Sequence, residues 1–317
     1  MRILVVGGAG YVGGAVTDYL LTMTAFHQVR VYDNLTFDEQ YSKPLEFVNG
    51  DVRDEGKLRP HLAWADVVIW LAALVGDGAC QVRESEAVAI NRDAVRFLAQ
   101  NFNGRILFTS TCSVYGAQDG ILSEESPTSP ISIYARTKLE SEHILTSMNK
   151  NAVIIRFGTL FGLSDSFCRV RFDLVVNTMT LSAMKNGKIV VNGGSQWRPL
   201  LHVRDAGRLS VRMALECPPG IFNLHAINIQ IGEIAEAVRE TVGTDVVDID
   251  HVDVSDVDAR NYRVLSQPAH MLGYNPNMTI DTGIREIRDL LNSGRIRNPY
   301  SDRYVNHRYL QNERDKE

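Results

Sequence analysis

Short apolar runs alternate with amphipathic stretches over most of the chain. The apolar runs have the length and β-branched content of buried strands, and the stretches between them repeat their apolar positions at helical spacing. The alternation is typical of βαβ units, and it predicts an α/β fold, a doubly wound parallel (Rossmann) sheet with a smaller mixed α/β lobe. Strands are expected at 3–6, 29–33, 45–48, 65–73, 104–109 and 220–224, and helices through Leu21, from near Glu55, over 91–101, from Ile133, up to about Lys185 and over 231–242.

Glycines follow the first apolar run directly and precede the first helix. Gly8, Gly10 and Gly13 have the spacing of the dinucleotide fingerprint, and Gly7, Gly10 and Gly13 satisfy a shifted form of it. Such glycines turn the chain, let the backbone approach a pyrophosphate and pack the helix against the strand. The pyrophosphate would lie at the helix N-terminus, beside Tyr11 and Val12, where free N–H groups and the helix dipole favour an anion.

Acidic residues end the second and third predicted strands. Asp33 follows Gly13 by twenty residues, where a carboxylate accepts hydrogen bonds from the adenosine ribose and repels a 2′-phosphate. This predicts NAD rather than NADP, with Asn34 beside it; the alternative is a solvated loop carboxylate. Asp51 and Val52 are expected to flank the adenine, although Asp51 could instead cap the helix near Glu55.

Small residues follow the fourth strand, and a helix begins soon after. Leu71, Ala72 and Ala73 would let the backbone pass beneath the cofactor. Asn91 starts the helix over 91–101 and is counted among the cofactor-binding residues. Its alternative role is to hold the neighbouring loop by side-chain hydrogen bonds.

Hydroxyl groups concentrate after the fifth strand, and a tyrosine and a lysine follow on one helix. The segment 109–116 holds Thr111 and Ser113, and Tyr134 and Lys138 lie four residues apart, on one helix face. An ammonium beside a phenol favours the phenolate, so we expect Lys138 to lower the pKa of Tyr134 and make it a base for an alcohol. The alternative is an ordinary surface helix.

Composition and charge narrow the class of protein. The 317 residues carry a formal charge of −5, which favours neither nucleic acid nor an anionic membrane surface. No apolar run approaches the roughly 18 residues of a membrane span, and the first strand leaves no room for a signal peptide. The four cysteines lack a CxxC pair, so no metal site is predicted and a reducing cytoplasm fits best.

Together these motifs resemble an extended short-chain dehydrogenase/reductase of the NAD-dependent nucleotide-sugar epimerase/dehydratase family. The resemblance covers nearly the whole chain, from the glycine turn through Gly50–Val52, the hydroxyl segment and Tyr134/Lys138 to 198–205. It implies NAD as cofactor, a nucleotide-diphosphate sugar as substrate, and oxidation at C4 of the sugar. Tyr134 would take the hydroxyl proton, Thr111 would bind the reacting oxygen, and Lys138 would hold the ribose.

The resemblance also implies a set of substrate-binding residues. Arg198 and Arg260, the latter within 258–263, match arginines that bind the nucleotide diphosphate, and Thr159 stands where an asparagine is usual. His202 is expected to hold a turn rather than to be a ligand. The full set comprises Thr111, Cys112, Ser113, Thr159, Arg169, Arg171, Asn177, Arg198 and Arg260.

The reaction itself is left with alternatives. Family dehydratases carry an Asp-Glu pair directly after the threonine, and this chain has Cys112 and Ser113 there, so dehydration is disfavoured. We favour a 4-epimerase. The alternatives are a net dehydrogenase or ketoreductase, for example of a nucleotide-linked heptose, to which 71–76 and 169–177 are similar, and a non-catalytic NAD-binding protein.

The resemblance further suggests how the chain is organised. We expect a cofactor domain at 1–157 to which 200–226 returns, a substrate lobe at 158–199 and 227–297, and a tail at 298–317 that is either docked or frayed. A homodimer is expected through the helices near Asn91 and Tyr134, with Ala94, Phe97 and Leu98 as the apolar residues that motivate it.

Overall fold

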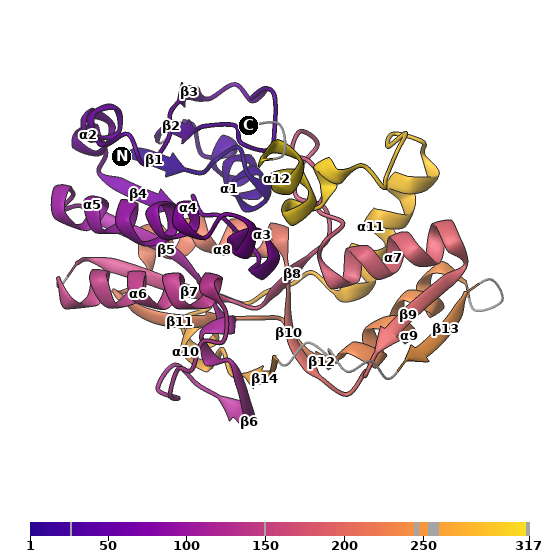
Figure 1. Cartoon of the computed structure of the whole chain (residues 1–317). Helices are drawn as coiled ribbons and strands as arrows, with labels where there is room; N and C mark the ends of the chain where they lie inside the picture. Colours follow the sequence, from indigo (N-terminus) through magenta and orange to yellow (C-terminus); the bar gives the residue numbers. More distant parts are fainter. Residues whose placement is uncertain (26, 149, 244–246, 253–259, 315–317) are drawn as a thin grey trace.

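A seven-stranded sheet with every neighbouring pair parallel organises the larger part of the molecule (Figure 1). The computed structural model describes residues 1–25, 27–148, 150–243, 247–252 and 260–314. In spatial order the strands are β11 (Gly220–Leu224), β7 (Ala152–Phe157), β5 (Arg105–Thr111), β4 (Val67–Trp70), β1 (Arg2–Val6), β2 (Gln28–Asp33) and β3 (Glu46–Asn49). The order reverses between β1 and β4, which is where an open α/β sheet forms its ligand crevice. The predicted doubly wound sheet is confirmed.

Alternate residues of each central strand enter two separate cores, because side chains on a strand point to opposite faces. In β1, Ile3 and Val5 pack toward α1 (Tyr11–Leu21) and α8 (Val203–Glu216). Leu4 and Val6 pack on the other face, toward α2 (Glu55–Trp64), α5 (Ala94–Asn101) and α6 (Ile133–Ser147). Both faces of the sheet are therefore covered by helices, and only the strand ends are open for a ligand.

A second group of elements surrounds its own apolar core, at the lower right of Figure 1. Its members are β8 (Thr159–Phe161), α7 (Val175–Asn186), β9 (Lys188–Asn192), β10 (Trp197–His202), β12 (Ile227–Gln230), α9 (Ile231–Val242), β13 (Asp248–Val252) and α11 (Ile280–Asn292). β10 pairs antiparallel with β12 and parallel with β8, so this part is mixed as predicted. His202 at the end of β10 caps α8, since its Nδ1 accepts the Arg204 N–H; this agrees with the turn role expected for it.

The remaining elements connect and edge these two groups. They are α3 (Asp77–Val82), α4 (Glu84–Val88), the π-helical turn η1 (Ala89–Asp93), η2 (Cys112–Tyr115), β6 (Ala117–Leu122), β14 (Asn261–Val264), α10 (Gln267–Met271), η3 (Asp302–Tyr304) and α12 (Asn306–Arg314). The tail is docked through Arg314, because Leu310 of α12 is 1% exposed and packs in one cluster with Ala79 of α3. Among the described residues, no helix combines the length and apolarity that a membrane span needs.

The apolar residues that motivated a homodimer are used inside the chain. Ala94, Phe97 and Leu98 of α5 are at most 5% exposed and belong to the core beneath the sheet. This part of the prediction is wrong in its physical basis, because a residue packed in its own core offers no apolar surface to a second copy. The sides of α5 and α6 that stay exposed carry polar residues such as Arg96 and His143.

Candidate active site

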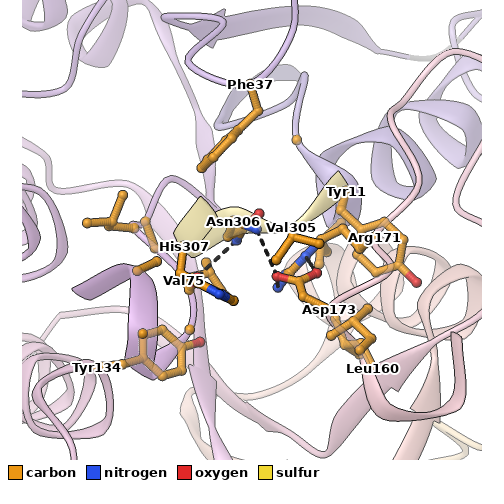
Figure 2. A pocket seen from close by; sticks show the side chains of 18 of the residues that line it. Tyr11, Phe37, Val75, Tyr134, Leu160, Arg171, Asp173, Val305, Asn306 and His307 are labelled. Carbon is orange, nitrogen blue, oxygen red and sulfur yellow. Dashed lines mark hydrogen bonds and ion pairs between the residues drawn. The ribbon is translucent and has the colours of Figure 1, made fainter. Parts of the chain in front are cut away.

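A cavity of 1060 Å³ lies at the carboxyl ends of β1, β4 and β5, where the strand order reverses (Figure 2). Its size suits a dinucleotide and a second ligand better than one small molecule. Most of the residues that the sequence assigned to a site line it together: Gly7, Gly10, Tyr11, Val12, Gly13, Asp33, Asn34, Asp51, Val52, Leu71, Ala72, Ala73, Thr111, Ser113, Tyr134, Lys138, Thr159, Arg169, Arg171, Arg198 and Arg260.

The glycine turn is built so tightly that side chains are excluded at two positions. Gly7 has a φ of +85°, and a Cβ on it would lie 2.5 Å from the Ala72 nitrogen. A Cβ on Gly13 would lie 2.3 Å from the carbonyl oxygen of Gly7. The first glycine therefore lets β1 and the segment after β4 approach each other, and the last lets α1 start against the turn.

Gly10 differs because no packing constraint among the described residues explains it. Its φ is −77°, which any residue adopts, and a Cβ there would meet only Gly7 oxygen, at an ordinary 3.5 Å. Gly10 is also the N-cap residue of α1 and has no side chain to bond the first N–H groups of the helix. The open space above Gly10 and the uncapped helix N-terminus fit a pyrophosphate. The residues present therefore fit the dinucleotide that the motif implies.

Asp33 ties the glycine turn to the end of β2. One carboxylate oxygen accepts the Ala9 N–H at 3.0 Å, and the other accepts the Leu35 N–H at 2.8 Å. Burial raises the pKa of this carboxyl, while these backbone donors oppose the rise. Asp33 also lines the cavity, and a carboxylate has more acceptor sites than these backbone donors occupy, so it can accept a ribose hydroxyl. Asp33 is thus not the freely solvated loop residue of the alternative interpretation.

Asp51 lines the cavity and is held in place by its neighbours. The Arg53 side chain donates two hydrogen bonds to it, of 2.9 and 2.7 Å, and lowers the pKa of the carboxyl to about 2. The backbone N–H of Arg53 donates a third at 2.8 Å, and the Asn34 side chain a fourth at 3.0 Å. The helix cap of α2 is Asp54 instead, whose side chain accepts the Lys57 N–H. The capping alternative for Asp51 is therefore wrong.

Tyr134 and Lys138 both reach the cavity, but the electrostatics between them differ from the prediction. Lys138 Nζ donates to the carbonyl of Thr109 at 2.6 Å and lies over the ring of Phe108. Burial lowers the pKa of Lys138 to about 7, so its charge is only partly present at neutral pH. Burial also raises the pKa of Tyr134. The expectation that the pKa of Tyr134 is lowered is wrong for the chain alone, because burial is the largest influence on this pKa and raises it.

The cation that does act on Tyr134 is Arg171. Its charge lowers the pKa of Tyr134, opposing burial, and its guanidinium lies over the ring of Tyr11. Asp173 fixes Arg171 by two hydrogen bonds, of 2.9 and 2.8 Å. Sequence reasoning placed Arg171 among the substrate-binding residues and missed this relation, because no local pattern connects it to Tyr134, which is 37 positions earlier in the sequence.

The hydroxyl segment presents alcohols but no acid beside Thr111. Thr111 Oγ1 accepts the Ser113 N–H at 3.1 Å and keeps its own hydrogen for a ligand oxygen. Ser113 Oγ shares a hydrogen bond of 3.1 Å with Tyr262. Cys112 is fully buried against the carbonyl of Arg156, and burial raises the pKa of its thiol. Cys112 lies outside the cavity lining, so its assignment as a direct substrate contact is corrected.

Two asparagines assigned to ligands serve the backbone instead. Asn91 is 1% exposed and bonds both the N–H and the carbonyl of Leu74, which is the alternative role considered for it. Asn177 is fully buried and bonds Gly162 and the carbonyl of Arg171. Neither lines the cavity, because each buried amide makes three hydrogen bonds within the chain, the third of Asn91 being to the Thr137 hydroxyl, and has no face left for a ligand.

The arginines at the far side of the cavity are already engaged. Arg260 pairs with Asp77 at 3.1 Å, and Arg198 is 5% exposed and donates to the carbonyl of Trp197. Asp258 and Ala259, which belong to the same predicted motif, lie outside the described residues. A diphosphate bound by Arg260 would have to compete with Asp77, a carboxylate that the sequence interpretation did not include.

One wall of the cavity comes from a segment to which no role was assigned. Val305, Asn306, His307 and Arg308, at the start of α12, line the same cavity as the glycine turn and Tyr134. Figure 2 shows Asn306 and His307 above Tyr134 and below Phe37. The tail composition carries no motif that could have revealed this.

Comparison with known proteins fixes the family. A family model described as the NAD dependent epimerase/dehydratase family matches residues 3–225. The chain therefore belongs to the NAD-dependent epimerase/dehydratase family, of the extended short-chain dehydrogenase/reductase type, as its motifs suggested. The family description agrees with NAD as the predicted cofactor.

Named relatives within the family differ in their reactions. The chain is 28% identical to a dTDP-glucose 4,6-dehydratase of Actinoplanes, over 90% of this chain and 96% of the relative. It is 34% identical to a UDP-glucose 4-epimerase of Halalkalibacterium halodurans, over 77% of this chain and 81% of the relative. A solved dTDP-glucose 4,6-dehydratase of Streptomyces venezuelae with NAD bound has a TM-score of 0.79 and 24% identity, over 93% of this chain and 98% of that chain. The last likeness shows the fold alone.

Proposed function

We propose that the protein is an NAD-dependent nucleotide-sugar 4-epimerase. The observation that carries the proposal is that Thr111, Tyr134 and Lys138 line one cavity with the glycine turn. One cavity therefore holds both a site for the nicotinamide end of a dinucleotide and side chains that can act on an alcohol. It lies at the strand ends, where this fold binds ligands.

Each residue has a defined task in this proposal. Tyr134 takes the proton of the C4 hydroxyl, and Thr111 donates a hydrogen bond to the same oxygen. Arg171 stabilises the phenolate, and Lys138 holds the cofactor ribose. Bound NAD supplies the acceptor for the hydride from C4. The neutral 4-keto sugar then turns over in the cavity. Hydride returns to C4 on the opposite face and Tyr134 returns the proton to the oxygen, so the configuration at C4 is inverted.

The residues after Thr111 favour this outcome over dehydration. A dehydratase of this family needs an acid and a base there, to remove the C5 proton and to protonate the leaving group. Cys112 is a buried thiol with a raised pKa, and Ser113 is bonded to Tyr262. Neither supplies a carboxyl group. A net dehydrogenase differs only in releasing the ketone and reduced cofactor.

The same proposal assigns the chain's parts and its assembly. Residues 1–157 with 200–226 form the cofactor domain, and 158–199 with 227–297 form the substrate lobe, in which Arg198 and Arg260 hold the diphosphate. A homodimer through α5 and α6 is also proposed, now through their polar exposed sides. Sedimentation at micromolar concentration tests it: a dimer is expected, and a monomer would refute it.

The experiment that tests the activity is a substrate panel. The protein is incubated with UDP-, dTDP-, GDP- and CDP-linked hexoses and heptoses, while absorbance reports NADH and NMR reports configuration at C4. We expect one C4-inverted product without accumulation of NADH. Stoichiometric NADH would indicate a net dehydrogenase, and a 4-keto-6-deoxy product would show dehydration, contrary to the proposal.

A further inference from the structure

One buried asparagine joins the two walls of the cavity through the C-terminal strap, by which we mean residues 298–314. Asn306 is 3% exposed, and its Nδ2 donates to the carbonyl of Val75 at 2.9 Å. Its backbone N–H donates to Asp173 at 3.1 Å, and its Oδ1 accepts a hydrogen bond from Arg169. Figure 2 shows Asn306 between Val75 and Asp173. The strap therefore bridges the loop after β4 and the segment between β8 and α7.

The strap is held at further points along the same line. Arg303 lies 3.6 Å from Asp38, in the loop after β2, and the rings of Tyr309 and Phe37 are 5.4 Å apart. Leu310 is 1% exposed against α3. These contacts attach the strap to the loops that follow two strands of the large sheet, so the bridge at Asn306 is part of an extended cover.

The cover lies over the path that a dinucleotide takes through the cavity. Asp33 marks the adenosine end and Tyr134 the nicotinamide end of that path, and both line the cavity with Asn306. In Figure 2, Asn306 lies between Phe37, near the adenosine end, and Tyr134. A ligand that extends from Asp33 to Tyr134 therefore fills a space that Asn306 also lines.

We propose that Asn306 is a cofactor-retaining residue: its bonds to Val75, Arg169 and Asp173 close the strap over bound NAD and slow its release. This inference rests on the proposed function only in taking NAD as the ligand. Retention suits a reaction that returns the hydride to the same sugar, because the reduced cofactor must stay in place until the ketone has turned.

The first test measures release of NADH from the full-length protein. Protein loaded with NADH is mixed with lactate dehydrogenase and excess pyruvate, which consume NADH as it dissociates. Asn306→Ala removes the two side-chain hydrogen bonds, to Val75 and Arg169, and keeps the backbone bond to Asp173; this is expected to raise the release rate by about 10- to 100-fold. Asn306→Asp keeps the acceptor for Arg169 and loses the donor to Val75, so its NADH release rate should lie between those of the wild-type protein and Asn306→Ala.

The matched control is an asparagine on the same helix. Asn312 is exposed, bonds Asp302 within the strap and does not line the cavity. Asn312→Ala should release NADH at the wild-type rate. Equal release rates for Asn306→Ala and wild-type would overturn the inference, whereas the epimerase proposal would stand or fall separately on the substrate panel.

A second test does not depend on how well a truncated side chain is tolerated. A Cβ on Gly78 would lie 3.2 Å from Cβ of His307, near the separation found in disulfides, and Gly78 has no positive φ that a side chain would strain. The pair Gly78→Cys and His307→Cys should therefore crosslink the strap to α3. Oxidation after loading should slow NADH release at least about 10-fold, and dithiothreitol should restore it. Release at an unchanged rate from crosslinked protein would contradict the inference.

Discussion

The glycine turn and the C-terminal strap both line one cavity, and they differ in how the sequence specifies them. Gly7, Gly13 and Asp33 lie within one strand–turn–helix–strand unit, and their spacing follows from its geometry. Asn306 instead bonds groups 231, 137 and 133 positions away. A motif is visible in a sequence when its residues act within one local unit. A polar bridge between distant segments leaves no such pattern, although it completes the same site.

The largest expected effect concerns the residue that sequence alone assigned to proton transfer. Tyr134→Phe removes the phenol oxygen and keeps the ring, so turnover should fall by about 10²–10⁴-fold, with the dissociation constant of NADH nearly unchanged. Tyr262→Phe is the control, because it removes a second buried phenol of the same cavity, one that is bonded to Ser113. A similar loss for both variants would show that Tyr134 has no special role.

A variant of Arg171 tests a relation that the sequence does not show, since only the structure connects this residue to Tyr134. Removing its charge in Arg171→Met should raise the pKa of Tyr134, because the cation lowers that pKa in the wild-type protein. The limb of the kcat/KM profile that rises with pH should move to higher pH, and the rate at neutral pH should fall by about 10–100-fold. Arg171→Lys should restore part of the shift. An unchanged pH profile would contradict the assignment.

Asp33 should determine the preference for NAD over NADP. Binding measurements alone test this role. Wild-type protein should bind NAD at least about 10-fold more tightly than NADP, since the carboxylate bonds the ribose and repels a 2′-phosphate. Asp33→Asn keeps an acceptor for one backbone N–H and removes the charge, so the difference between the affinities for NAD and NADP should become smaller. Fluorescence titration with NADH and NADPH measures both. Equal affinities in the wild-type protein would refute the role of Asp33.

The smallest expected effect concerns Lys138 and the stability of the cofactor-free protein. Its pKa is about 7 in the folded chain and near 10.5 when unfolded, so the unfolded state binds more protons between these values. Stability from this residue therefore rises with pH, by about 1–2 kcal/mol between pH 7 and 8.5. Denaturant melts of wild-type and Lys138→Met should diverge by that amount over this window. Parallel pH dependence would show that Lys138 is not buried as described.

The fold was more predictable than the roles of individual polar residues. The strands near 3–6 and 29–33 and the helix over 231–242 appear within a residue or two of their predicted bounds, because apolar periodicity alone determines them. Asn91 and Asn177 were misassigned, since an amide that serves a ligand and one that serves a buried backbone look alike in sequence. The direction of the Tyr134 pKa shift was mispredicted for a similar reason. Burial and the position of Arg171 come from tertiary packing, whereas the spacing of Lys138 comes from one helix.

In the proposed reaction, one hydride leaves C4 and returns to the same carbon of the same molecule. The most direct measurement uses a nucleotide sugar deuterated at C4, identified from the substrate panel, and follows the label by NMR and mass spectrometry. We expect the C4-inverted product to keep its deuterium at C4, with none in free NADH or solvent. Deuterium found in released NADH, or an unlabelled product, would contradict the claim.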